Sequence, residues 1–150
     1  MNYYKTVWIS DIHLGSVNCR ASELLDFLKH NDAEKIYLVG DIIDGWRLKN
    51  KWYWPQEHND VIQKLLRKAR NGTNVIYIPG NHDEVARQFT GLAFGEIPIK
   101  TDDIHVTVSG QRLWVTHGDQ MDALMFHAKW FSKIGDFLYE MVTLASRISH

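Results

Sequence analysis

The sequence lacks the marks of secreted and membrane-spanning proteins. It has a single cysteine, Cys19, which excludes an internal disulfide and suits a reducing cytosol. The opening segment MNYYKTVWIS has no basic region followed by an apolar one, so we see no secretory signal. No apolar run is long enough to span a bilayer. We therefore expect a cytoplasmic protein, with contact at a membrane surface left open.

The sequence also lacks an excess of charge of either sign. Its 17 Lys and Arg residues nearly balance its 18 Asp and Glu residues, which gives a formal net charge of -1 at pH 7. A nearly neutral chain has no overall field that would hold a polyanion, so we expect no nucleic-acid partner. Hydrophobic residues make up 45% of the 150 residues, enough to form the core of one compact domain.

Short apolar runs alternate along the chain with segments of helical periodicity. Residues 6–10 and 35–40 have the β-branched and aromatic composition of buried strands, and residues 21–31 between them carry leucines on one helical face. This order predicts an α/β fold with parallel strands. The later expected elements are a helix that starts at Pro55 and stops at Asn71-Gly72, a strand at 74–80, a short helix near 84–89, and a hairpin that turns at 109–111.

Apolar residues recur at helical spacing through the last segment, about residues 122–148. The chain then ends without a glycine or proline stop signal, as though cut inside the helix. Two interpretations stay open: a C-terminal helix that docks on the sheet, or an incomplete unit. An apolar stripe without a partner would also favour self-association through this helix.

Four short polar motifs each follow a predicted strand. The carboxyl ends of strands in an α/β sheet meet at one edge, so we expect the motifs to converge. Their Asp, Asn and His side chains supply the oxygen and nitrogen ligands that suit Mn²⁺, Fe or Zn²⁺, and a carboxylate between two ligand sets can bridge two metals. Two such metals generate a hydroxide and stabilise an in-line displacement at phosphorus. The motifs are DIH at 11–13, GDIID at 40–44, GNHD at 80–83 and THGD at 116–119.

Each motif alone has an ordinary structural explanation. Asp41 or Asp44 could cap a helix, and Asn81 could serve a tight turn. Such explanations must account for every motif separately. All four motifs in this order therefore favour a metal site over a set of unrelated structural roles.

The set DxH, GDxxD, GNHD and HGD resembles the motifs of the calcineurin-like metallophosphoesterases. The segments LVGDIIDGWRLKNKWYWPQEHNDV and HGDQMD are similar to the UDP-2,3-diacylglucosamine pyrophosphatase branch, which serves lipid A precursor synthesis. The resemblance covers nearly the whole chain. It implies a sandwich of mixed β-sheets flanked by helices, incomplete at the C-terminus, that hydrolyses a phosphoester or pyrophosphate bond. The implied substrate is a phosphorylated small molecule or nucleotide-lipid, which leaves peripheral contact with the inner membrane open.

The resemblance also implies a division of roles. His82 would face the phosphate and help the leaving oxygen, with Asp83 orienting it, since a carboxylate on one ring nitrogen fixes the tautomer. Asp44 and Asp119 would hold ligands in place. The implied cofactor is a pair of divalent ions, Mn²⁺ first, with Fe, Zn²⁺ or Mg²⁺ as alternatives. The implied ligands are Asp11 and His13 for the first ion, Asp41 as the bridge, and Asn81 and His117 for the second ion.

Two departures from the family pattern bear on these expectations. Better-known members of the lipid A branch carry arginine where this chain has His82, so a phosphodiesterase or phosphatase acting on soluble nucleotides is the alternative. The family pattern also ends in a GHxH motif that completes both metal sites, and this sequence has no Gly-His pair and no His-x-His. We therefore expect residues 1–150 to be the N-terminal part of a single domain, ending within a helix that belongs to a cap.

With a histidine missing from each metal, we expect weak metal binding and little turnover by the chain alone. The alternative of another class is a non-catalytic remnant or interaction module.

The segment GWRLKNKWYW at 45–54 lies beside the proposed metal edge. Arg47 and Lys49 could hold a second phosphate, arginine through its bidentate fork. Trp46 and its aromatic neighbours could line an acyl groove or stack on a base. The alternative is a loop that its aromatic residues pack onto the domain. Three further histidines look like surface or packing residues, and we assign them no role: His30, His58 and His105.

Overall fold

The computed structural model describes residues 2–122. The chain divides into two compact units, Met1–His117 and Gly118–His150. In the second unit, the backbone N–H groups of Met121 and Asp122 donate to the Gly118 carbonyl, which begins a helical turn. The helix expected at about 122–148 lies outside the described residues and stays a prediction.

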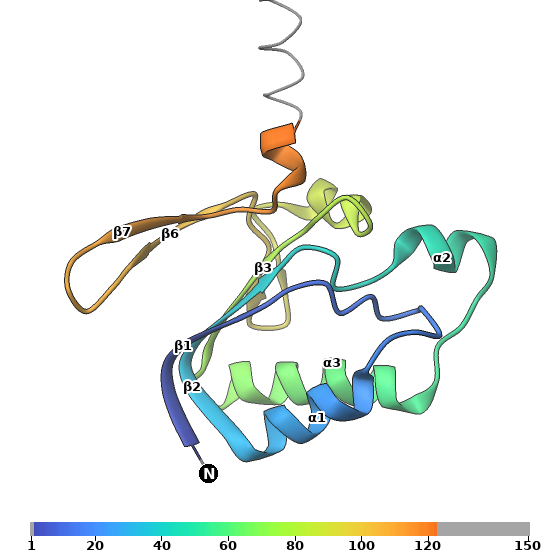
Figure 1. The fold of residues 1–150 in the computed structure, drawn as a ribbon, viewed down its shortest axis with the longest axis horizontal. Helices are drawn as coiled ribbons and strands as arrows, with labels where there is room; N and C mark the ends of the chain where they lie inside the picture. The colour runs from blue at the N-terminus through green and yellow to red at the C-terminus, as the bar shows by residue number, and fades with distance from the viewer. Residues whose placement is uncertain (1, 123–150) are drawn as a thin grey trace, which may run out of the picture. The chain divides into compact units, whose positions relative to one another are not determined.

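A parallel sheet of three strands in the order β1-β2-β3 forms the centre of the first unit (Figure 1). These strands are β1 (Asn2–Ile9), β2 (Asn31–Val39) and β3 (Asn74–Ile78). Val7 lies opposite Ile36, which in turn lies opposite Val75. The predicted parallel pairing is therefore confirmed. The strands predicted from residues 6 and 35 begin earlier, at Asn2 and Asn31, where the residues are mostly exposed or half-buried.

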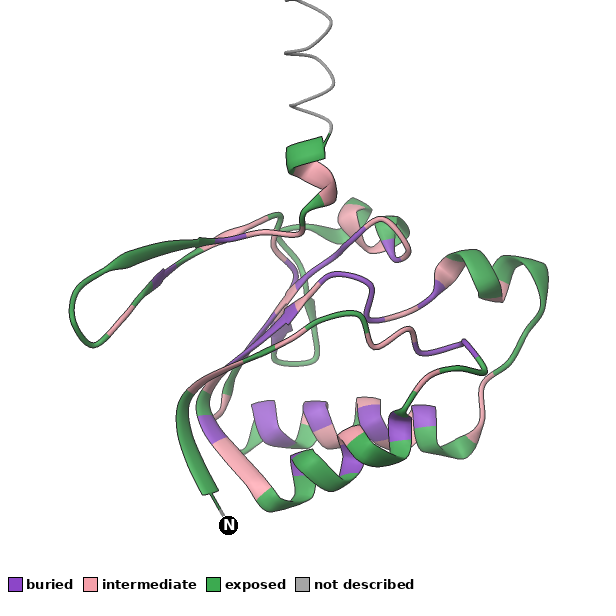
Figure 2. Cartoon of the chain, viewed as in Figure 1, coloured by how far each residue is buried: buried purple, intermediate pink, exposed green. Residues whose placement is uncertain are grey.

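Two helices, α1 (Ala21–His30) and α3 (Gln56–Arg70), lie side by side against one face of the sheet (Figure 1). Their buried residues recur one turn apart, and Figure 2 shows them gathered on the sides of the helices that pack together. Pro55 immediately precedes α3 rather than being its first residue. The main core forms between these helices and the strand residues that point toward them, among them Leu25, Leu28, Val61, Leu65, Ile36 and Val75.

The alternate strand residues point to the other face of the sheet. There Tyr37, Ile76 and Ile78 pack with Val115 of β7 (Arg112–Val115), which pairs with β6 (Asp103–Val106) as the predicted hairpin. The Tyr37 hydroxyl donates to Asp103 Oδ2 at 2.8 Å and so ties β6 to β2. The mixed α/β class is thus confirmed, and residues 2–122 contribute one three-stranded sheet and two hairpins to it.

Several short elements differ from the sequence prediction. Residues 45–50, for which a packed loop was one interpretation, form α2 (Gly45–Asn50), a helix too short to show apolar periodicity. The expected short helix is the 3-10 helix η1 (Glu84–Phe89), and it leads to an unpredicted hairpin of β4 (Ala93–Phe94) and β5 (Ile97–Pro98). Among residues 2–122, no helix combines the length and the apolar character that crossing a membrane requires.

Candidate metal centre

The loops that leave β1 and β2 stay paired beyond the ends of the strands. His13 N–H donates to the Asp41 carbonyl and Leu14 N–H to the Ile42 carbonyl, each at 2.9 Å. Asp44 N–H then donates back to the Leu14 carbonyl at 2.7 Å. This ladder fixes the DIH motif against the GDIID motif, as expected for loops at the carboxyl edge of a parallel sheet.

Three of the predicted ligands have left-handed backbone conformations. Asp11, His13 and Asp41 have φ values of 54°, 54° and 55°, and they are the non-glycine residues with positive φ in the part of the chain that the structure describes. Such conformations cost on the order of 1 to 3 kcal/mol each and persist where surrounding contacts impose them, often at functional sites. The backbone strain of this unit is therefore concentrated at the predicted ligands.

Asp11, His13 and Asp41 form a cluster in which one ligand atom of each lies within 4.8 Å of the others. The Oδ2 atom of the buried Asp41 lies 4.0 Å from His13 Nε2 and 3.9 Å from His117 Nε2. One carboxylate oxygen thus lies between ring nitrogens from the first and the fourth motif, as a bridging ligand requires. Asp41 Oδ1 accepts a hydrogen bond from the His82 backbone N–H at 3.0 Å.

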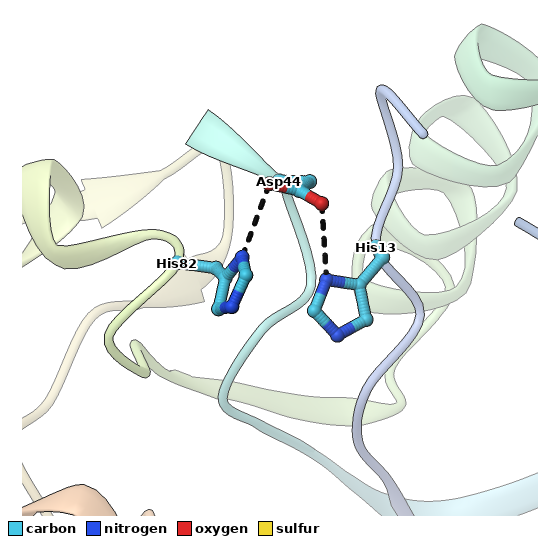
Figure 3. Close-up of side chains that lie close together, drawn as sticks. All are labelled: His13, Asp44 and His82. Atoms are coloured by element: carbon cyan, nitrogen blue, oxygen red, sulfur yellow. Dashed lines mark hydrogen bonds and ion pairs between the residues drawn. The ribbon is translucent and has the colours of Figure 1, made fainter. Parts of the chain in front are cut away.

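A second cluster joins His13, Asp44 and His82 (Figure 3). The Asp44 carboxylate lies between the two rings, with Oδ2 at 3.3 Å from His13 Nδ1 and Oδ1 at 3.1 Å from His82 Nδ1. Asp44 is only 3% exposed. Burial opposes its ionisation, but hydrogen bonds from the His82 ring and the Arg47 backbone N–H outweigh that effect and lower the pKa of Asp44. A proton on His13 Nδ1 leaves its Nε2 lone pair available to a metal.

Asp83 has different partners from those expected. Its buried carboxylate accepts from the backbone N–H groups of Asp41 at 3.2 Å and Ile42 at 2.8 Å, and from the Tyr77 hydroxyl at 2.6 Å. Burial and the Asp83 charge raise the pKa of Tyr77, so its hydroxyl stays a donor. The residue whose carboxylate lies at the His82 ring is Asp44. Asp83 turns inward because the backbone N–H groups of the GDIID loop need a buried acceptor.

Two glycines allow the motifs to come close together. A Cβ atom on Gly40 would lie 2.0 Å from His117 Cδ2, and one on Gly80 would lie 2.3 Å from Asp41 Oδ1. Gly40 also has a φ of +70°. A larger residue at either position would displace a predicted ligand. Asn81 follows Gly80 directly and is half-buried.

Two hollows meet at His82. One of about 540 Å³ has mostly polar residues in its lining, among them Arg47 and two of the predicted metal ligands, Asp11 and His13. An apolar one of about 490 Å³ lies among α2, α3, η1 and the β4–β5 hairpin, with Trp46 and Lys49 in its lining. The Trp46 ring centre lies 4.1 Å from that of His82. The predicted substrate residues are thus divided between the two hollows.

The remaining predicted residue, Asp119, belongs to the second unit, so its role beside the ligands stays a prediction. Sequence reasoning also missed one residue of the first unit. His58 is buried and its Nδ1 accepts from the Gly15 backbone N–H, two residues after His13. A partner that is a backbone group 43 residues away leaves no pattern in the sequence that could have revealed it.

Comparison with known proteins gives one family. A family profile described as calcineurin-like phosphoesterase matches residues 4–143. A UDP-2,3-diacylglucosamine hydrolase of Histophilus somni is 30% identical over 125 residues, which cover 78% of this chain and 50% of that protein. A UDP-2,3-diacylglucosamine hydrolase of Chromohalobacter salexigens is 29% identical over 119 residues, which cover 77% of this chain and 47% of that protein. The chain spans about half the length of the curated relatives it matches.

Among solved structures, the nuclease MPE of Pseudomonas putida matches with a TM-score of 0.35 and 18% sequence identity. The match covers 61% of this chain and 45% of that one.

Proposed function

Because the chain belongs to the calcineurin-like phosphoesterase family, a family of metal-dependent hydrolases, we propose that the edge described above is its centre for hydrolysing a phosphoester or pyrophosphate bond. The observation that supports this most is the position of Asp41 Oδ2, between His13 Nε2 and His117 Nε2 at 4.0 and 3.9 Å. The substrate is phosphorylated, as the family requires.

The donor set fits a pair of hard or borderline divalent ions. It combines carboxylate oxygens with imidazole nitrogens and has no thiolate, which suits Mn²⁺ first and Fe, Zn²⁺ or Mg²⁺ as alternatives. When bound, the ions supply a nucleophile from water at neutral pH and stabilise the charge that builds up at phosphorus. We assign the first ion to Asp11, His13 and Asp41, and the second to Asp41, Asn81 and His117.

His82 is the proposed proton donor to the leaving oxygen. Its Nδ1 bonds to Asp44, which leaves Nε2 to carry the transferable proton. Because Asp44 ionises readily, it supports the protonated ring, so we assign to Asp44 the orienting role first expected of Asp83. Asp83 instead holds the backbone of Asp41 in place.

The substrate we propose joins a phosphate-linked nucleotide to an apolar group, as a UDP-sugar lipid of the lipid A precursor class does. Support comes from the two hollows that meet at His82, one polar and one apolar. The names of the relatives point to the same class of substrate. Arg47 would bind a second phosphate in the polar hollow, and Trp46 and Lys49 would contact the lipid side. Such a reaction belongs in the cytoplasm at the inner membrane surface.

One observation favours a second candidate, a phosphodiesterase or phosphatase acting on soluble nucleotides. Trp46 is 45% exposed and its ring lies beside His82, so a nucleotide base could stack on it. The remnant or interaction module remains the alternative without catalysis.

Metal content measured together with turnover separates these possibilities. In the chain extended by the segment that completes the ion sites, we expect Mn²⁺ binding and hydrolysis of bis(4-nitrophenyl) phosphate, both weakened by about tenfold or more in Asp41→Asn and kept in the exposed control Asp26→Asn on α1. A protein that binds no metal and turns over no phosphodiester would favour the remnant. If turnover is found, comparing UDP-diacylglucosamine with UDP-N-acetylglucosamine and a soluble dinucleotide distinguishes the two substrate classes.

The proposed domain boundary has its own test. If two histidines from a further segment complete the ion sites, residues 1–150 fused to the C-terminal half of the Histophilus somni relative should bind Mn²⁺ about tenfold or more tightly than the chain alone. Full activity of the 150-residue chain by itself would contradict this proposal.

A further inference from the structure

Gly15 connects the DIH motif to the residues before α1, and its backbone N–H donates to the Nδ1 atom of His58 at 3.0 Å. Both residues are buried, and His58 is only 2% exposed. A buried backbone N–H without an acceptor costs about 1 to 3 kcal/mol, so losing this hydrogen bond would destabilise the fold. It joins helix α3 to the loop that carries two predicted metal ligands.

Gly15 is also confined on its other side. Its φ is +100°, and a Cβ atom there would lie 2.7 Å from Leu48 Cγ of α2. The backbone at this position therefore lies between Leu48 and His58, in a conformation that favours glycine. A side chain at position 15 would therefore collide with Leu48 and displace the loop.

The His58 ring is held between two aromatic side chains, and its neutral form is favoured. Tyr53 packs edge to face against it at 5.8 Å between ring centres, and Trp54 does so at 5.6 Å. Burial lowers the pKa of His58, which keeps Nδ1 free of a proton and able to accept. The proton of the neutral ring then lies on Nε2.

The residues that precede Gly15 transmit this restraint to the ligands. Leu14 is fully buried and pairs with Ile42, and His13 pairs with Asp41 one step earlier. His13 holds its left-handed backbone, with φ of 54°, between this ladder and the Gly15 anchor. Without the anchor, the ladder alone would have to impose the strained conformation that turns the His13 ring toward Asp41 and Asp44.

We propose that His58 is a positioning residue for the metal centre: by accepting from Gly15 N–H, it holds the Asp11–His13 segment in the conformation that its ligands require. His58 touches neither metal nor substrate in this role. The functional consequence rests on the proposed metal centre, whereas the restraint on the loop does not. The aromatic segment before α3, which carries Tyr53 and Trp54, thereby supports the site through His58.

Substitutions at His58 separate the hydrogen bond from packing. His58→Phe keeps an aromatic ring of similar size but removes the acceptor, and His58→Asn places an amide oxygen near the position of Nδ1. His30→Phe on α1 is the matched control, since His30 is exposed and its ring pairs with Asp26 of its own helix. Thermal unfolding of each variant shows that the comparison is made between folded proteins.

The first measurement is NMR of the metal-free 150-residue chain labelled with ¹⁵N. A scalar coupling across the hydrogen bond should join Gly15 N to His58 Nδ1 in the wild type and be lost in His58→Phe. Amide exchange at Leu14 should accelerate in His58→Phe and not in the His30→Phe control. Absence of the coupling in the wild type, or unchanged exchange at Leu14 once the acceptor is gone, would overturn the proposal.

The second measurement is Mn²⁺ affinity by titration calorimetry. We expect His58→Phe to weaken binding by about tenfold, the lower end of what loss of a supporting contact around a metal costs, and His58→Asn to recover most of that loss. Equal affinity in wild type and His58→Phe would overturn the functional part of the proposal. If the wild type binds no Mn²⁺, the proposed metal centre fails, while the coupling and the exchange still decide whether His58 holds the loop.

If His58→Phe does not fold, the wild type and His58→Asn suffice. In that case His58→Asn must keep the slow exchange at Leu14. Fast exchange in a folded His58→Asn variant would count against the hydrogen bond.

Discussion

The Oδ1 atom of Asp44 lies 3.1 Å from Nδ1 of His82, and the opposite oxygen of the same carboxylate lies 3.3 Å from Nδ1 of His13. One buried acid thus orients the proposed proton donor and a proposed metal ligand at the same time. Its neighbours in the GDIID loop receive their support from Asp83. Asp44 therefore orients two histidine rings, whereas Asp83 holds the backbone of the loop.

Replacing Asp44 by Asn should separate its role as the cap of α2 from its role at the His82 ring. The amide oxygen can still cap α2 by accepting from Arg47 N–H, but the amide NH2 then faces His13 Nδ1, so we expect a moderate loss of stability and a changed His13 orientation beside the effect on His82. Without the charge, His82 loses support for its protonated form, and kcat for the phosphodiester should fall about a hundredfold. Steady-state kinetics with a thermal melt as control measures both. A variant with unchanged kcat would refute the role given to Asp44.

Replacing Asp41 by Asn should affect metal binding first. Asp41 Oδ2 faces both His13 and His117, so the substitution removes a charge from the proposed positions of both ions. We expect Mn²⁺ affinity to fall by about tenfold to a hundredfold in calorimetry. Asp26→Asn, on the exposed face of α1, should leave affinity unchanged. Equal affinity in Asp41→Asn and wild type would exclude Asp41 as the bridge.

A charge in the apolar hollow should discriminate between substrates. Phe89 of η1 lines this hollow and is about half exposed, so Phe89→Glu can fold and yet make the hollow unsuitable for an acyl chain. We expect KM for UDP-diacylglucosamine to rise about tenfold, with little change for a short aryl phosphodiester. Val17→Glu changes another exposed apolar residue, one that does not line the hollow. Parallel changes for both substrates would show that the hollow has no part in recognition.

The Asp103 carboxylate should make the unfolding free energy depend on pH. Burial opposes its ionisation, but hydrogen bonds from Lys100 and Tyr37 outweigh that effect and lower the pKa of Asp103. The ionised Asp103 therefore contributes to the unfolding free energy above its unfolded pKa of 3.8. This contribution is lost as the pH falls through the lower pKa of Asp103 in the folded protein.

Asp103→Asn tests this dependence. We expect it to lower the unfolding free energy by about 1 to 2 kcal/mol near pH 7 and by less as the pH falls below 3.8. Urea titrations at several pH values measure the difference, with Asp26→Asn as the exposed control. A difference that does not shrink in acid would mean that the charge of Asp103 does not stabilise the hairpin.

Local patterns were sufficient to predict the sheet and the motifs at its edge. The predicted third strand, NVIYIPG, contains β3, which ends at Ile78 before Pro79, and the leucines of α1 face the core as their spacing indicates. Residues whose roles depend on distant backbone groups were not predictable. Asp83 was paired with its sequence neighbour His82, whereas its carboxylate serves the loop of Asp41 from 42 residues away.

The same limit explains the other differences. The role of His58 could not be predicted because its partner is a main-chain N–H group, and every residue except proline has one. Short elements such as α2 have fewer residues than two helical turns, so they cannot repeat an apolar position often enough to be seen. The left-handed conformations at Asp11, His13 and Asp41 are also invisible in the sequence, because they are imposed by the pairing of one loop with another.

If ligands from different strands meet around Asp41 to hold two ions, anomalous diffraction at the manganese edge from crystals grown with Mn²⁺ will locate both of them. We expect one peak bounded by Asp11, His13 and Asp41, and a second bounded by Asp41, Asn81 and His117. Crystals with manganese bound elsewhere, or with no peak beside the Asp41 carboxylate at saturating Mn²⁺, would contradict the two-ion site.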